Sequence, residues 1–117
     1  MLAQYLDLTD EYNLNSEVKF ETSNYDYAVI QIIGQSVGSI RFKTTINSGA
    51  IQNVTDGNIL TSNNYTNAYA TQLSDGAIVV DANNGDGLYR LNVVGRYIKL
   101  EAAESVSKLL VMLTKIS

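Results

Sequence analysis

The sequence contains no histidine, cysteine, proline or tryptophan among its 117 residues. Without histidine and cysteine it lacks the commonest general base, the usual nucleophile pairs and the soft metal ligands, so we expect neither enzyme activity nor a cofactor. The absence of cysteine also excludes a disulfide framework. Without tryptophan, the best ring for stacking on sugars, a carbohydrate site would depend on the eight tyrosines.

Charged residues are also scarce, at 17% of the chain, and the formal net charge is −4. The basic residues are scattered, which argues against nucleic-acid binding because phosphate neutralisation requires clustered lysine and arginine. No apolar run is long enough to span a membrane, and the N-terminus lacks the basic and apolar regions of a signal peptide. We therefore expect a chain that folds in the cytoplasm where it is made.

Because proline is absent, the turns must come from glycine, asparagine and aspartate, which reach the left-handed backbone region at low cost. Clusters of these residues recur about every eight to twelve residues, which is typical of short strands in a sandwich or barrel. The intervening runs predict strands at 18–21, 27–33, 39–45, 50–54, 65–73, 77–80, 88–94, 97–101 and 106–115. The sequence thus predicts an all-β fold, an antiparallel β-sandwich (jelly-roll or immunoglobulin-like) of about eight short strands.

The pair Gly95-Arg96 predicts a two-residue hairpin turn, because a type II′ turn requires glycine at its first central position. With the strand at 106–115, this hairpin would give three consecutive antiparallel strands. The turn predicts these opposite pairs: Val93 and Ile98, Leu91 and Leu100, Tyr89 and Ala102, Asn92 and Lys99, and Arg90 and Glu101.

Residues 1–24 are expected to form an extended N-terminal arm or a first edge strand, and residues 25–117 the β-sandwich domain. Apolar residues nowhere keep a helical period over three turns, so we expect at most a short helical turn, at 5–11.

The strand at 109–113 is apolar on both faces, and two explanations are open. A loop or the N-terminal segment of the same chain could cover its second face. Alternatively, Leu110 and Met112 lie on a face that another subunit covers, because burial of each side chain contributes about 1.5–3 kcal/mol. In the second case we expect an interface that also includes Tyr5, Leu6 and Leu8.

The segment 81–87 offers Asp81, Asn83 and Asp86 as oxygen ligands of the kind that Ca²⁺ prefers. Its spacing differs from that of an EF-hand loop, because Asp86 occupies the glycine position and Asn92 the position of the bidentate glutamate. A hairpin-type loop explains the same asparagines and glycines. We expect no metal here and keep the three residues as candidates only.

Several strings of the sequence are informative together: Tyr-Asp-Tyr-Ala-Val-Ile-Gln-Ile-Ile-Gly (25–34), Ser-Ile-Arg-Phe-Lys-Thr-Thr (39–45), Val-Thr-Asp-Gly-Asn (54–58) and Gly-Leu-Tyr-Arg-Leu-Asn-Val-Val-Gly-Arg-Tyr-Ile-Lys-Leu (87–100). Over about residues 25–117 the chain resembles small β-sandwich virion proteins of tailed bacteriophages, of the auxiliary capsid or head-decoration type found in crAss-like phages. The resemblance implies a structural role on the outer surface of the phage head. It also implies the major capsid protein or another virion protein as partner, and it allows a homo-oligomer.

An alternative with the same fold is a receptor- or glycan-binding module of a phage fibre or tail. Such a module would present a groove lined by Tyr25, Tyr65 or Tyr69, and calcium in the 81–86 segment.

Overall fold

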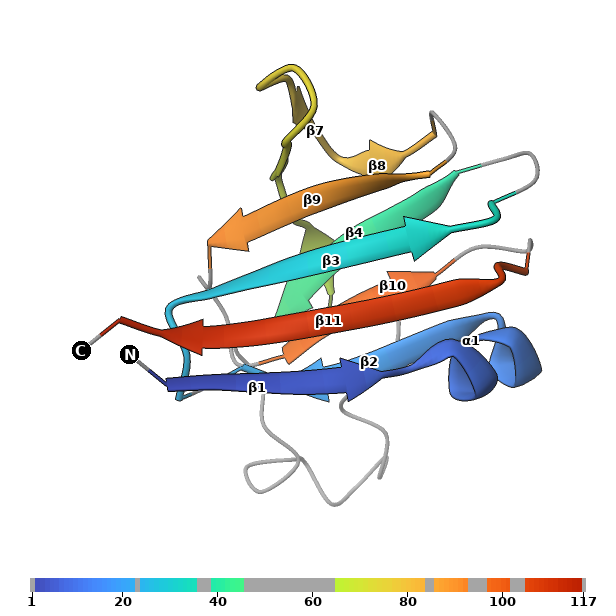
Figure 1. Cartoon of the computed structure of the whole chain (residues 1–117), viewed down its shortest axis with the longest axis horizontal. Coiled ribbons are helices and arrows are strands. Elements are labelled where there is room, and N and C mark those ends of the chain that lie inside the picture. The colour runs from blue at the N-terminus through green and yellow to red at the C-terminus, as the bar shows by residue number, and fades with distance from the viewer. Residues whose placement is uncertain are drawn as a thin grey trace.

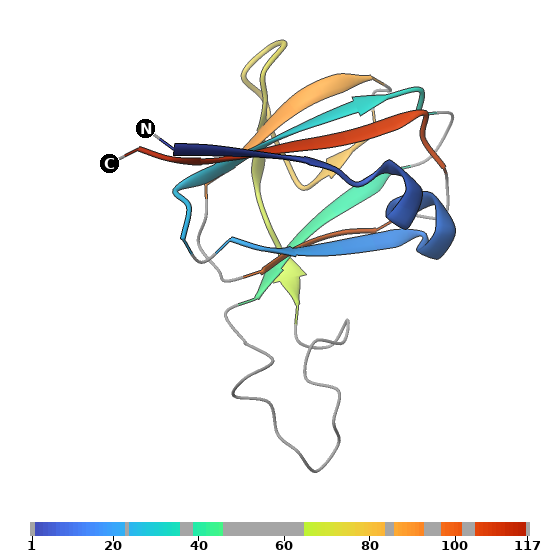
Figure 2. The same ribbon diagram turned by 60° about the horizontal axis from the view of Figure 1, so that its bottom comes forward.

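Two antiparallel β-sheets pack face to face in the computed structural model of the chain, which confirms the predicted sandwich (Figures 1 and 2). The structure describes residues 2–22, 24–35, 39–45, 65–83, 86–92, 97–101 and 105–116. Its elements are β1 (Leu2–Asp7), α1 (Thr9–Asn15), β2 (Glu17–Glu21), β3 (Tyr27–Ile33), β4 (Ile40–Thr45), β5 (Thr66–Asn67), β6 (Ala70–Gln72), β7 (Ile78–Val79), β8 (Asp81–Ala82), β9 (Gly87–Asn92), β10 (Tyr97–Glu101) and β11 (Lys108–Lys115).

The larger sheet has six strands in the order β1-β11-β3-β9-β6-β7. The smaller sheet has the order β2-β10-β4-β5, and β8 also pairs with β4. The first and last long strands, β1 and β11, are neighbours in the larger sheet, so the two ends of the chain lie side by side (Figure 1). The front layer in Figure 1 is therefore built from both ends of the sequence and the middle strands β3 and β9.

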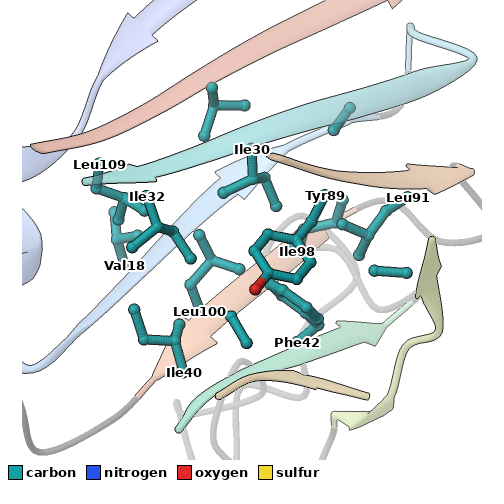
Figure 3. Packing of buried hydrophobic residues seen from close by; sticks show 14 of the residues in the cluster. Val18, Ile30, Ile32, Ile40, Phe42, Tyr89, Leu91, Ile98, Leu100 and Leu109 are labelled. Atoms are coloured by element: carbon teal, nitrogen blue, oxygen red, sulfur yellow. The ribbon is translucent and has the colours of Figure 1, made fainter. Parts of the chain in front are cut away.

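The core fills the space between the sheets, because alternate residues of each long strand point inward. In β3, Ala28, Ile30 and Ile32 are buried while Gln31 is exposed. The rings of Phe42 and Tyr89 connect the two sheets, with centroids 5.4 Å apart and an angle of 52° between their planes. Figure 3 shows this cluster, to which both sheets contribute: Val18, Ile30, Ile32, Ile40, Phe42, Tyr89, Leu91, Ile98, Leu100 and Leu109.

The predicted hairpin between 88–94 and 97–101 is wrong. Strand β9 pairs with β3 and β6 in the larger sheet, whereas β10 pairs with β2 and β4 in the smaller sheet. Leu91 lies opposite Ala28, and Leu100 lies between Val18 and Phe42. A connection that crosses between sheets produces the same inward alternation as a hairpin, so the period of the sequence could not distinguish the two.

Strand β11, expected to continue that hairpin, instead lies between β1 and β3. The predicted boundaries of β3 and β10 match the structure, and β11 begins two residues later than expected, at Lys108. The predicted strand at 65–73 consists of the short strands β5 and β6. Strand β8 was not predicted, and the expected strand at 50–54 lies outside the described residues.

The N-terminal segment contains one short helix, as expected, but further along the chain than the predicted 5–11. Tyr5 belongs to β1, and the helix begins at Thr9. The Asp7 carboxylate favours this start, because its Oδ1 accepts hydrogen bonds from the backbone N–H of Thr9 (3.1 Å) and from its hydroxyl (2.7 Å). Ser16, in the left-handed conformation, ends the helix and donates its N–H to the carbonyl of Tyr12.

Side chains of α1 hold the start of β11. The amide of Asn13 donates to the carbonyl oxygen of Val106 (2.8 Å) and accepts from its N–H (2.9 Å). The hydroxyl oxygen of Thr9 accepts from the N–H of Leu109 at 2.9 Å. These three bonds fix residues from opposite ends of the sequence to each other, beside the β1–β11 pair.

Candidate functional site: an apolar outer face

The outer face of the larger sheet carries apolar side chains, whereas the solvent-exposed face of an antiparallel sheet is normally polar. The strand register places Tyr5, Met112 and Val29 in one row across β1, β11 and β3. The adjacent row continues from Leu110 on β11 through Gln31 to Leu88 on β9. We call the five apolar members of these rows the outer apolar face: Tyr5, Val29, Leu88, Leu110 and Met112.

These side chains are accessible to water. Tyr5 is 75% exposed and Leu88 is 42% exposed, while Val29, Leu110 and Met112 are half-buried. The described part of the chain therefore does not seal the outer apolar face. The alternative that the N-terminal segment covers β11 fails, because β1 pairs with the edge of β11 and leaves its face open.

The outer apolar face is hollowed at its centre. A shallow depression of about 440 Å³ lies over β1, β11, β3 and β9. Its lining consists of the five residues of the outer apolar face together with Leu6, Val111, Asp7 and Gln31. Asp7 and Gln31 supply its polar side chains. A depression with a mostly apolar lining and few polar groups suits a protruding apolar side chain of another molecule.

The residues expected at an interface separate into two groups. Tyr5, Leu110 and Met112 lie together on the outer apolar face. Leu6 and Leu8 pack against the core from the same N-terminal segment, and Leu6 also borders the depression. Sequence reasoning missed Val29 and Leu88 as members of the face. The signal for Val29 was present, since residues 28–33 are apolar at nearly every position.

The outer face of the smaller sheet is different, because charged side chains of the same chain pair across it. Glu101 contacts Lys43 and Lys99, each with an N–O distance of 3.0 Å, and Arg41 at 3.5 Å. Burial alone would raise the pKa of Glu101, but hydrogen bonds from Lys43 and Lys99 outweigh it and hold the pKa below its ordinary value. Lys99 also lies over the ring of Tyr65, 4.8 Å from the centroid.

The candidate calcium ligands have different local partners. Asp81 lies in β8 opposite Arg41, whereas Asp86 accepts a hydrogen bond from the backbone N–H of Gly34 at 2.7 Å. Asn83 is exposed. Among the described residues, no group of three or more acidic side chains is placed to hold a metal ion.

The three tyrosines considered for a sugar site lie in different environments. Tyr65 is buried and Tyr69 is 70% exposed. Tyr25 is half-buried, and its hydroxyl donates to Oε1 of Gln4 at 2.6 Å. Tyr65 therefore offers no free ring face for stacking on a sugar.

Within the ranges that the structure describes, no helix is long and apolar enough to cross a membrane.

Comparison with known proteins identifies a fold but no family. No family model and no curated protein matches the sequence. Among solved structures, the chain is similar to the SPBc2 prophage-derived protein YomS, with a TM-score of 0.65 and 13% sequence identity. The similarity covers 96% of this chain and 92% of that one. At this level of identity it shows that the two chains share the sandwich fold.

Proposed function

We propose that the chain is a structural, non-catalytic virion protein that docks on the outside of a tailed-phage head as an auxiliary or decoration component. The observation that carries the proposal is the open outer apolar face on the larger sheet. In a protein that acts alone in water, side chains such as Leu110 and Met112 would gain nothing from this position. On an assembled shell, they would be buried against the capsid protein.

The comparison supports the same class of protein. YomS is described as prophage-derived, and its fold covers nearly the whole of this chain. The resemblance of residues 25–117 to phage head proteins points in the same direction. The absence of histidine and cysteine is consistent with a role that requires binding rather than catalysis.

The shape of the molecule fits one-sided docking. The outer apolar face lies on one layer, and the ion pairs around Glu101 lie on the opposite outer face. A shell presents many equivalent sites, so each contact can be weak and the particle can still be covered.

A co-sedimentation assay with purified phage heads tests this proposal. The wild-type chain is expected to pellet with heads and to stay in solution without them. The double variant Leu110→Gln and Met112→Gln is expected to bind at least about tenfold more weakly, because burial of each side chain contributes about 1.5–3 kcal/mol. Thermal unfolding of the free variant verifies that the sandwich still forms.

Leu14→Gln is the matched control, because Leu14 is 83% exposed on α1 and lies outside the outer apolar face. It is expected to bind heads like the wild type. Equal binding of the double variant would contradict docking through this face. Absence of the chain from purified particles would overturn the head-protein proposal itself, and binding to glycans instead would favour a receptor-binding module.

A further inference from the structure

In the part of the chain that the structure describes, the two sheets have four edge strands, which differ in how they are protected against pairing with another strand. At two of them, β5 and β7, the edge strand has only two residues. At the third edge, β2 alternates charged residues along one side: Glu17, Lys19 and Glu21. Short strands and charges are the devices by which natural proteins block edge-to-edge association.

Strand β1 is the exception. It is an edge strand of six residues, and it contains no proline, glycine or lysine. Its one charge, on Asp7, lies at its end and already accepts hydrogen bonds from Thr9. Ala3, Gln4 and Tyr5 are exposed. An edge of this length and composition is a ready template for another strand.

The hydrogen-bond pattern identifies which backbone groups of β1 are directed to the open side. The N–H of Leu8 donates to the carbonyl of Leu109 at 2.9 Å, in register with the β1–β11 ladder. Hydrogen-bonding positions alternate along an antiparallel strand, so Gln4 and Leu6 also direct their backbone groups to β11. Ala3, Tyr5 and Asp7 therefore direct theirs away from the sheet.

We propose that β1 pairs with β1 of a second copy of this chain, antiparallel and about a two-fold axis. In the register that uses all three outward-directed residues, Tyr5 lies opposite Tyr5 of the other copy and Ala3 lies opposite Asp7. The two six-stranded sheets then form one continuous sheet. This self-association is independent of the proposed docking on phage heads, since it concerns the purified chain alone.

A second copy of the chain can pair with this edge without bringing like charges together, and its apolar face continues that of the first copy. The register places Asp7 opposite the small, uncharged Ala3, and it keeps the two Asp7 carboxylates about 13 Å apart along the strands. A register that paired Asp7 with itself would place like charges face to face, which is destabilising. Tyr5, 75% exposed in the single chain, then lies beside Tyr5 of the other copy on the same face of the sheet. The outer apolar faces of both copies then adjoin across the axis.

Sedimentation equilibrium of the purified chain is the first test. The wild type is expected to have twice the mass of the 12.8 kDa chain at high concentration. Tyr5→Pro is expected to be monomeric, because proline removes an N–H that is directed away from β11 and so leaves the β1–β11 ladder bonded. A wild type that stays monomeric up to its solubility limit would overturn the proposal.

Cysteine cross-linking tests the register of the proposed strand pair. It does not require that the fold tolerates a proline at position 5. The chain has no cysteine of its own, so a single substitution reports one position. In Tyr5→Cys the two Cα atoms would lie about 5.5 Å apart, within the range that a disulfide can bridge. The variant is expected to form a covalent dimer under mild oxidation.

Ala3→Cys is the matched control, because its two sulfurs would be separated by about 13 Å along the strands and should not cross-link. Equal cross-linking of the two variants would indicate random collision and would contradict the two-fold register. Cross-linking of Ala3→Cys alone would overturn the register in favour of a shifted one.

Discussion

The ammonium group of Lys99 lies 3.0 Å from a carboxylate oxygen of Glu101, and the Lys99 side chain is only 1% exposed. Lysine is almost never fully buried without a partner. The register makes the pair necessary, because Lys99 lies directly between Lys19 on β2 and Lys43 on β4. Three lysines in one row repel one another, and Glu101 in the next row compensates two of them.

Replacement of this carboxylate is expected to be costly. Glu101→Gln leaves the charge of Lys99 buried without its acidic partner, and the free energy of unfolding is expected to fall by about 3 kcal/mol. Urea unfolding measures this loss. Lys19→Met is the control, since its ion pair with Glu17 is more exposed (3.5 Å, side chains 36% and 39% exposed) and should contribute at most about 1 kcal/mol. Similar losses in both variants would contradict a special role for the buried pair.

Stability is expected to fall in acid for the same reason. The pKa of Glu101 is lowered in the folded chain, because the hydrogen bonds from Lys43 and Lys99 outweigh the opposing effect of burial. A carboxyl group with a lowered folded-state pKa stabilises fully above its unfolded pKa, about 4.3, and loses this contribution as the pH falls through the folded value. Unfolding free energies measured between neutral and acidic pH should decline in this window.

Two carboxylates are expected to contribute separately to the decline of the unfolding free energy in acid. Hydrogen bonds from Thr9 lower the pKa of Asp7 as well, so Asp7→Asn should remove a separate part of the decline. Glu101→Gln should remove the part of the decline that is due to Glu101, so that the unfolding free energy depends less on pH. If neither variant changes the slope, other groups control acid unfolding.

Alkaline titration should reveal tyrosines that lose their protons later than usual, because burial raises the pKa of both Tyr65 and Tyr89. Burial, and secondarily the nearby Tyr97 and Glu17, raise the pKa of Tyr65 to about 12. Because the neutral form is favoured in the folded chain, its contribution to stability is intact below pH about 10 and is lost as the pH rises toward the folded value. Ultraviolet absorbance of tyrosinate should show a late component that Tyr65→Phe diminishes. An unchanged late component in that variant would contradict this assignment.

Two glycines with the same backbone conformation should respond differently to alanine. Gly34 has φ of +76° and Gly76 has φ of +78°, so alanine is strained at both. At Gly34 the new Cβ would also clash with the Ser107 hydroxyl oxygen, whereas at Gly76 nothing lies within 4 Å. Thermal unfolding should show a loss of about 1 kcal/mol for Gly76→Ala and a loss larger by about 1–3 kcal/mol for Gly34→Ala. Equal losses of stability in the two variants would mean that the Ser107 side chain moves aside at no cost.

Local pattern in the sequence predicted the strands but not the way they pair. The strand at 97–101 matches because its apolar and polar residues alternate, and the strand at 27–33 matches because it is a short apolar run rich in β-branched residues with turn residues at both ends. The hairpin at Gly95 failed because Leu91 and Leu100 face inward in either arrangement. Pairing across sheets depends on long-range contacts that no short window of sequence contains.

The candidate site was predictable in part for a similar reason. A run such as Leu109–Leu113, apolar on both faces, indicated that one face needs cover, and Leu110 and Met112 do lie on an open face. The contribution of Leu88 came from β9, which the sequence had paired with β10 instead of β3. The burial of Lys99 was missed for the same reason, since the predicted hairpin placed it opposite Asn92 on a polar face.

The most direct test of docking is a cryo-electron microscopy reconstruction of the intact particle at side-chain resolution. We expect density for this chain on the outside of the head, with Tyr5, Leu110 and Met112 packed against a capsid protein. Density in which these three side chains face solvent, while another surface touches the shell, would contradict the account.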